Sequence, residues 1–167
     1  ENVLLDEFGR AKIADFGCAQ SDSLIQQEES KVVAKGMKDF LYAAPEEIRS
    51  NGKKFSRMSD IFSLGNVLWE MVAGQSPFGG KWSEEVSLKI LAGEVEPLPE
   101  GSCPSPAFEA LIRDCRALEP ASRPDIEAVV QRLKDMREDF GVCLNRVLVP
   151  ETEMQLDELC PPENREC

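Results

Sequence analysis

The sequence predicts a mainly α fold, in which a short β-hairpin is followed by a helical bundle around one buried central helix. Two observations support this prediction. Near the start of the chain, two short β-compatible runs flank a turn that contains Asp and Gly. From residue 45 onward, apolar residues recur at helical spacing, and several of these runs begin with a residue that caps helices. At 167 residues, the chain has about the length of one domain.

The hairpin is expected to pair residues 3–5 with residues 11–14. The turn between them contains Asp6 and Gly9, residue types that tolerate the backbone angles of tight turns. Residues 17–39 follow, a polar segment in which neither the helical nor the strand period is sustained. A loop this long inside a compact domain is usually functional or disordered.

The central helix is predicted over residues 58–73, after a short helix over residues 45–49 that Pro45 can open. Apolar side chains cover most of the circumference of the central helix and leave one narrow polar stripe, formed by Asp60, Ser63, Asn66 and Glu70. A helix that is apolar nearly all round belongs in the middle of a fold. The other helices are therefore expected to pack around it, and Trp69 is expected to lie in the core.

Three further helices complete the predicted bundle. Ser83 caps one that runs to about Leu91, and Ser105 with Pro106 opens the next. In that second helix one face is apolar, formed by Phe108, Leu111, Ile112 and Cys115. Asp125 caps the last helix, whose apolar stripe ends before Gly141 and consists of Ile126, Val129, Val130, Leu133 and Met136.

The C-terminal residues have a different composition. Residues 151–167 contain six acidic residues against Arg165 alone, together with Pro161 and Pro162. Such a segment cannot bury much apolar surface. The sequence therefore predicts a folded unit over residues 1–140 and an acidic, disordered tail over residues 141–167.

Composition excludes several classes of function. The 19 Lys and Arg residues against 31 Asp and Glu residues give a net charge of −12, which disfavours broad binding to nucleic acid or anionic lipid. No apolar run approaches the length of a membrane helix, so no membrane insertion is expected from this segment. The chain has no His, which removes the commonest general base and any metal site that contains His.

The six cysteines are widely scattered and form no C-x-x-C pair. The sequence also shows no secretory signal, and it begins with Glu1 directly before a strand-like run. We therefore expect reduced thiols, a cytoplasmic location and a natural N-terminus upstream of Glu1.

A set of motifs, in order along the chain, carries the chemistry. Glu1-Asn2 stands before the hairpin, and Asp15-Phe16-Gly17 follows it. Ala44-Pro45-Glu46 closes the polar loop, Asp60 begins the buried helix, and Arg123 precedes the last helix. With this set, residues 1–136 resemble the C-terminal lobe of the α+β fold of the eukaryotic protein kinases, either Ser/Thr kinases or their tyrosine-kinase-like relatives. Glu1-Asn2 is similar to the end of the H-R-D-L-x-x-x-N catalytic loop, and the other two motifs are similar to D-F-G and A-P-E.

The resemblance implies that Asn2 and Asp15 bind Mg²⁺ and, through it, ATP. Their residue types suit that role, because Mg²⁺ prefers oxygen ligands and a hairpin brings the two side chains together. A simple turn role for Asn2 is the alternative. The implied activity is transfer of the ATP γ-phosphate to hydroxyl groups of a protein substrate. The loop over residues 17–39 would then be the activation loop.

The resemblance also assigns structural roles. Glu46 and Arg123 are expected to form a buried ion pair between the activation segment and the base of the lobe. Asp60 resembles the aspartate that holds the catalytic loop, although an ordinary helix cap or a favourable charge near the helix N-terminus would also explain it.

The sequence departs from the family pattern in two ways. The catalytic Asp is expected about four residues upstream of Glu1, and the N-terminal lobe also lies outside the sequence, so this fragment alone should be inactive. Lys38-Asp39 stand where many Ser/Thr kinases have Gly-Thr. An active kinase and a pseudokinase that serves as an interaction scaffold are therefore both retained, whereas the ordered motifs argue against an unrelated helical interaction domain.

Residues near these motifs also indicate substrate specificity and regulation. Glu1 before Asn2 resembles the Ser/Thr form of the catalytic loop, while residues 68–71 resemble tyrosine kinases and their relatives. Ser/Thr specificity is preferred. Ser21 and Ser23 are candidate phosphorylation sites, with a plain solvated loop as the alternative, and nearby Glu28 and Glu29 argue against Ser30.

Overall fold

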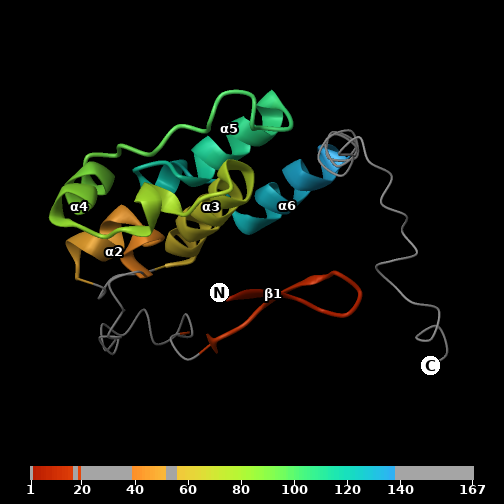
Figure 1. Cartoon of the computed structure of the whole chain (residues 1–167), viewed down its shortest axis with the longest axis horizontal. Coiled ribbons are helices and arrows are strands. Elements are labelled where there is room, and N and C mark those ends of the chain that lie inside the picture. The colour runs from red at the N-terminus through yellow and green to blue at the C-terminus, as the bar shows by residue number, and fades with distance from the viewer. Residues whose placement is uncertain (1, 17–18, 20–38, 52–55, 138–167) are drawn as a thin grey trace.

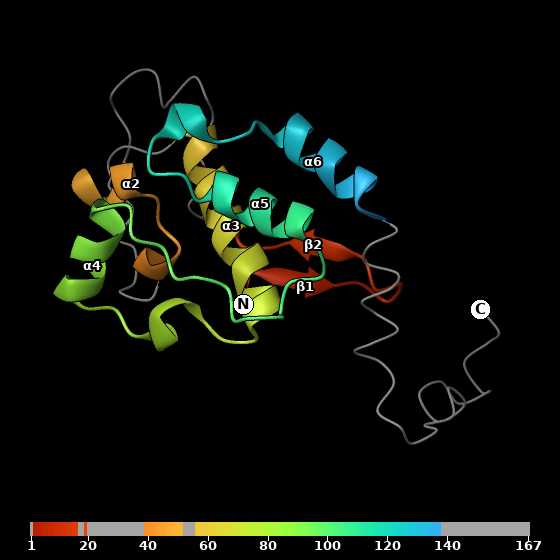
Figure 2. The same cartoon turned by 90° about the horizontal axis from the view of Figure 1, so that it is seen from above.

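The helical part of the molecule is organised around α3 (Arg57–Ala73). In this computed structural model, which describes residues 2–16, 19, 39–51 and 56–137, α5 (Pro106–Cys115) and α6 (Ile126–Asp135) pack on one side of α3. The helices α2 (Pro45–Arg49) and α4 (Glu84–Leu91) lie on the other side, and Figures 1 and 2 show the same arrangement in two views. The predicted central helix is therefore confirmed, and it begins one residue earlier than expected.

The strands β1 (Val3–Leu5) and β2 (Ala11–Ile13) form the predicted antiparallel hairpin. Figure 1 shows this hairpin below the helices rather than within them. All six strand residues are exposed, so the two strands contribute nothing to the buried core of the described chain.

Helix starts follow the caps that the sequence predicts. The side chains of Ser83, Ser105 and Asp125 each accept a hydrogen bond from the backbone N–H three residues later, which satisfies one otherwise unpaired helix donor. At α3 the cap is Ser56, and Asp60 falls within the first turn. Asp60 is therefore not the helix cap, which corrects one of the alternatives drawn from the sequence.

Short 3-10 turns connect these helices and were not predicted. They cover Asp39–Leu41, Pro77–Gly80 and Pro120–Ser122. In the second of them Phe78 has a φ of 51°, a left-handed conformation that is uncommon outside glycine. Its backbone N–H donates to the Glu96 carboxylate at 2.6 Å, which holds this turn in place.

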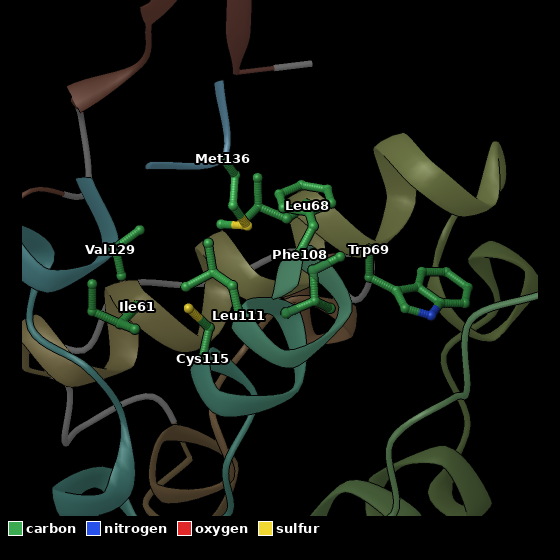
Figure 3. Close-up of a cluster of buried hydrophobic side chains, with 9 residues drawn as sticks. Ile61, Leu68, Trp69, Phe108, Leu111, Cys115, Val129 and Met136 are labelled. Carbon is green, nitrogen blue, oxygen red and sulfur yellow. The ribbon is translucent and has the colours of Figure 1, made fainter. Parts of the chain in front are cut away.

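Two clusters of buried side chains form the core. Figure 3 shows the larger one, to which α3 contributes Trp69, α5 contributes Leu111 and Cys115, and α6 contributes Val129. The smaller one lies between α3 and α4 and consists of Leu41, Ala44, Phe62, Val86 and Ile90. The burial predicted for Trp69 and for the apolar face of α5 is confirmed.

The prediction for α6 is wrong in part. Val129 and Met136 are buried, but Ile126 and Val130 are 48% and 41% exposed. Successive helix residues are about 100° apart, so Val130 lies well round the helix from Val129. The helix therefore buries a narrower face than its sequence stripe suggests, centred on Val129 and Met136.

The domain boundary and the tail prediction lie outside the described residues, which end at Arg137. Most of the loop over residues 17–39, including Ser21 and Ser23, also lies outside them, as does Glu1.

Candidate functional site

Asn2 and Asp15 lie together at the open end of the hairpin. The strands pair with Val3 opposite Ile13, and the N–H of Ala14 donates to the Asn2 carbonyl at 2.9 Å. Asn2 therefore stands opposite Ala14, and Asp15 is the next residue along the chain. Both residues are exposed.

The closed end of the hairpin fixes this register. One oxygen of Asp6 accepts from the backbone N–H groups of Phe8 and Arg10, and the other accepts from Arg10 Nε at 2.8 Å. Hydrogen bonds from Arg10, the backbone one above all, keep the pKa of the Asp6 carboxyl below its ordinary value. The turn residue that the sequence indicates thus controls which residues meet at the other end.

Asp15 has a φ of 62°, in the left-handed region. Among residues other than glycine, Asp and Asn enter this region most readily, because their short polar side chains can bond locally. The backbone therefore turns sharply at the residue that the sequence singles out, two residues beyond the end of β2.

The oxygens of Asn2 and Asp15 fit a hard divalent cation. Within the described residues, no group of three His, Cys, Asp or Glu side chains could hold a metal ion. A metal at the open end of the hairpin would therefore need further oxygens from a nucleotide and from water. Mg²⁺ binds in this way, through one or two protein ligands, substrate phosphates and several waters.

Glu46 and Arg123 form a two-pronged ion pair. Arg123 Nη1 lies 2.7 Å from Glu46 Oε1, and Nη2 lies 2.9 Å from Oε2. The Arg123 side chain is fully buried and that of Glu46 is 20% exposed. The ion pair implied by the resemblance is thus present, and it joins α2 to the segment before α6.

The rest of the Arg123 guanidinium is also occupied. It donates to the carbonyls of Met58, Ala117 and Leu118 at 2.8–3.1 Å, and it lies 5.0 Å from the centre of the Phe62 ring. A buried charge is tolerated only when its hydrogen-bonding capacity is used in this way. Arg123 therefore ties together the starts of α2 and α3 and the loop that follows α5.

Burial alone would raise the pKa of the Glu46 carboxyl. The hydrogen bonds and positive charge of Arg123, with a further hydrogen bond from Ser59, outweigh that effect and hold the pKa below its ordinary value. The Ser59 hydroxyl donates to Glu46 Oε1 at 2.9 Å. Glu46 is therefore ionised throughout the neutral range.

Asp60 is exposed near the start of α3. Its negative charge in the first helical turn is favourable toward the helix dipole. The described residues do not include a catalytic loop that it could hold, so that role stays a prediction.

Sequence reasoning missed a second buried cation, Arg116. Its guanidinium lies 5.4 Å from the centre of the Trp69 ring, and Nη1 donates to the Glu96 carbonyl at 2.9 Å. Its Nε has no hydrogen-bond partner within the described part of the chain. Burial lowers the pKa of Arg116 to about 10. No local pattern marks this residue, because its partners lie on another helix and in a distant loop.

Comparisons of this sequence with known proteins agree on one protein family. The model of the protein tyrosine and serine/threonine kinase family matches residues 1–133. The mitogen-activated protein kinase kinase kinase MCK1 of Pyricularia oryzae is 36% identical over 126 residues, which are 74% of this chain and 8% of that protein. The serine/threonine/tyrosine-protein kinase HT1 of Arabidopsis thaliana is 32% identical over 134 residues, which are 80% of this chain and 32% of that protein.

A human relative, the mixed lineage kinase domain-like protein, is 30% identical over 133 residues, covering 79% of this chain and 28% of that protein. The chain thus spans less than a third of the length of each of these relatives. In the described part, none of the helices has both the length and the apolar character needed to cross a membrane. The family model covers most of the chain, and the chain belongs to the protein tyrosine and serine/threonine kinase family.

Proposed function

We propose that this chain is the C-terminal-lobe part of a protein kinase that transfers the γ-phosphate of ATP to Ser or Thr hydroxyls of protein substrates. The observation that carries the proposal is the hairpin register, which sets Asn2 and Asp15 at one open end. This is the pair of oxygen ligands that the family resemblance assigns to Mg²⁺.

The chain's own residues have separable roles in this proposal. Asn2 and Asp15 would hold Mg²⁺, which neutralises negative charge on the phosphates of ATP when bound. The Asp6 turn maintains the register that brings these two residues together. The Glu46–Arg123 ion pair anchors the end of the loop that leads from Asp15 to α2. The catalytic Asp would come from residues upstream of Glu1, and this chain alone would be inactive.

Specificity for Ser and Thr rests on two observations. Glu1 precedes Asn2, as in the Ser/Thr form of the catalytic loop. The printed name of the relative HT1 includes serine and threonine as well as tyrosine. A cytoplasmic location, phosphorylation at Ser21 or Ser23, and attachment of the catalytic loop by Asp60 belong to the same proposal and rest on the sequence.

The test uses the parent polypeptide, including the residues upstream of Glu1. Asp15→Asn removes a charged ligand and keeps the side-chain shape, so the rate of phosphoryl transfer should fall about 100-fold or more, because a fixed electrostatic stabiliser is lost. Circular dichroism and the thermal midpoint should stay near those of the wild type. Asp135→Asn on α6 is the matched control and should transfer phosphate at the wild-type rate. Near-normal turnover by a folded Asp15→Asn protein would contradict the proposal.

A pseudokinase scaffold is the second candidate. Lys38-Asp39 before Tyr42, in place of the common Gly-Thr, is the observation that favours it. The same assay separates the two, since a pseudokinase parent would show no transfer even with Asp15 intact.

A further inference from the structure

The turn between α3 and α4 has an unusual backbone. Phe78, Gly79 and Gly80 have left-handed φ values of 51°, 61° and 70°. Glycine adopts this conformation freely, whereas a residue with a Cβ does so only at an energetic cost. A contact from outside the turn is therefore needed to hold Phe78 in this conformation.

Glu96 supplies that contact from the loop between α4 and α5. Its Oε2 accepts a hydrogen bond from the Phe78 N–H at 2.6 Å. Hydrogen bonds to an ionised carboxylate are shorter and stronger than those between neutral groups. Phe78 and Trp82 also pack against the smaller buried cluster, to which α4 contributes Val86 and Ile90. The Glu96 carboxylate therefore holds the turn and, through the turn, the start of α4.

The main chain of Glu96 is itself anchored to the helical body. Nη1 of Arg116, the residue directly after α5, donates to the Glu96 carbonyl at 2.9 Å. Nε1 of Trp69, whose indole lies at one edge of the larger cluster in Figure 3, donates to the Pro97 carbonyl at 3.2 Å. A residue that precedes proline also has a restricted backbone. The backbone at Glu96 is thus fixed, and only its side chain remains to change position.

Arg116 offers the Glu96 carboxylate a second partner. Arg116 is 5% exposed, and its Nε has no hydrogen-bond partner within the described residues. An unused donor on a buried guanidinium is costly. Burial lowers the pKa of Arg116 to about 10, and the negative charge of Glu96 opposes this effect. Because Nη1 already bonds to the Glu96 main chain, the rest of the guanidinium lies within reach of the Glu96 side chain.

We propose that Glu96 is a two-position latch. In one position, the one in this structure, its carboxylate holds the left-handed turn at Phe78. In the other, it pairs with the Arg116 guanidinium and releases the turn, which loosens the start of α4 from the smaller cluster. Each position satisfies one group and leaves the other without a partner, so a partner that binds only one position of α4 would shift the balance. The latch needs no bound nucleotide and does not depend on the proposed function.

Hydrogen exchange of the dilute chain separates a latch from a fixed contact. Arg116→Met removes the second partner and keeps an apolar stem, a replacement that is often neutral or stabilising for a buried charge. The carboxylate of a latch then stays with the turn, so a peptide covering residues 76–83 should exchange more slowly than in the wild type. With a fixed contact, loss of the bond to the Glu96 carbonyl loosens the loop and speeds exchange. Equal or faster exchange in Arg116→Met would therefore overturn the proposal.

Glu96→Gln tests the other side of the latch. The same peptide should exchange about tenfold faster or more, because a hydrogen bond to a charged group is lost. Glu94→Gln, at an exposed position of the same loop, is the matched control and should exchange as the wild type does. Wild-type exchange in Glu96→Gln would show that the carboxylate does not hold the turn.

Relaxation dispersion of ¹⁵N-labelled chain measures the two positions directly. The Phe78 amide and the Arg116 Nε–H should report exchange at one shared rate, with a minor population of about 1–10%, because one carboxylate leaves one group as it reaches the other. Glu96→Gln should remove this exchange at both groups, and Glu94→Gln should keep it. Different rates at the two groups, no exchange at either, or exchange that persists in Glu96→Gln would each contradict the latch.

Discussion

At the scale of single residues, the Glu46–Arg123 pair shows how one contact makes stability depend on pH. The pKa of Glu46 is below its ordinary value of 4.5 in the folded chain. Above that value the carboxylate is ionised in both the folded and the unfolded state, and its contribution is fully present. As the pH falls through the lowered pKa, the unfolded state takes up more protons, so this contribution is lost.

We therefore expect Glu46→Gln to be destabilised by about 3–5 kcal/mol at neutral pH, because the buried Arg123 charge loses its partner. The difference from the wild type should shrink as the pH falls below the ordinary glutamate pKa of 4.5. Urea unfolding of the chain between neutral and acid pH measures it. Glu119→Gln, at an exposed position, is the control and should follow the wild-type curve. A constant difference at every pH would contradict the assignment.

At the scale of secondary-structure elements, the crossing of α3 and α5 depends on the absence of a side chain. A Cβ at Gly65 would lie 2.8 Å from both Arg116 Cγ and Cys115 Cβ, and 3.3 Å from the Cys115 backbone carbon. Real side chains do not approach so closely, and backbone is among the atoms that would have to move. The missing side chain at Gly65 thus lets the C-terminal end of α5 pack closely against the predicted central helix.

Gly65→Ala should therefore destabilise the chain by about 1–3 kcal/mol through overpacking, although alanine is the better helix former. The thermal midpoint and the urea midpoint measure the loss. Met71→Ala on the same helix removes an exposed side chain and should change stability by less than about 0.5 kcal/mol. A Gly65→Ala protein as stable as the wild type would show that α3 and α5 can separate without cost.

At the scale of the whole molecule, the hairpin presents apolar side chains to solvent. Val3, Leu5 and Ile13 are 51%, 72% and 72% exposed, and the register of the strands sets them on one face. Contiguous apolar surface of this kind drives association. Figure 1 shows the hairpin below the helices, and these three side chains stay exposed within the described residues.

We expect this chain to associate as its concentration rises, and the double change Leu5→Thr with Ile13→Thr to reduce that association. Threonine is β-branched, a shape that strands favour, and it removes apolar surface at both positions. Sedimentation velocity over a range of concentrations measures the effect. Leu88→Thr, at an exposed position of α4, should not reduce it. A wild-type chain that stays monomeric throughout would contradict the expectation.

The sequence predicted most of the local structure. The hairpin, the bounds of the helices over residues 45–49, 58–73 and 84–91, and the caps at Ser83, Ser105 and Asp125 agree with the structure to within about a residue, because they depend on neighbours a few positions away. The positions of Asn2 and Asp15 followed from the hairpin. The Glu46–Arg123 ion pair was predicted from the family resemblance alone, because its members are 77 residues apart and no local sequence pattern links them.

The tertiary structure alone decided which residues far apart in the sequence contact one another. The sequence shows that Ser63, Asn66 and Glu70 form a polar stripe. Only the fold shows that this stripe makes hydrogen bonds to Tyr42, 21–28 residues away. The burial of Arg116 and the exposure of Ile126 and Val130 on α6 are likewise visible only in the fold. Periodicity tells which side of a helix is apolar, whereas the chain brought against each side depends on how all the helices pack together.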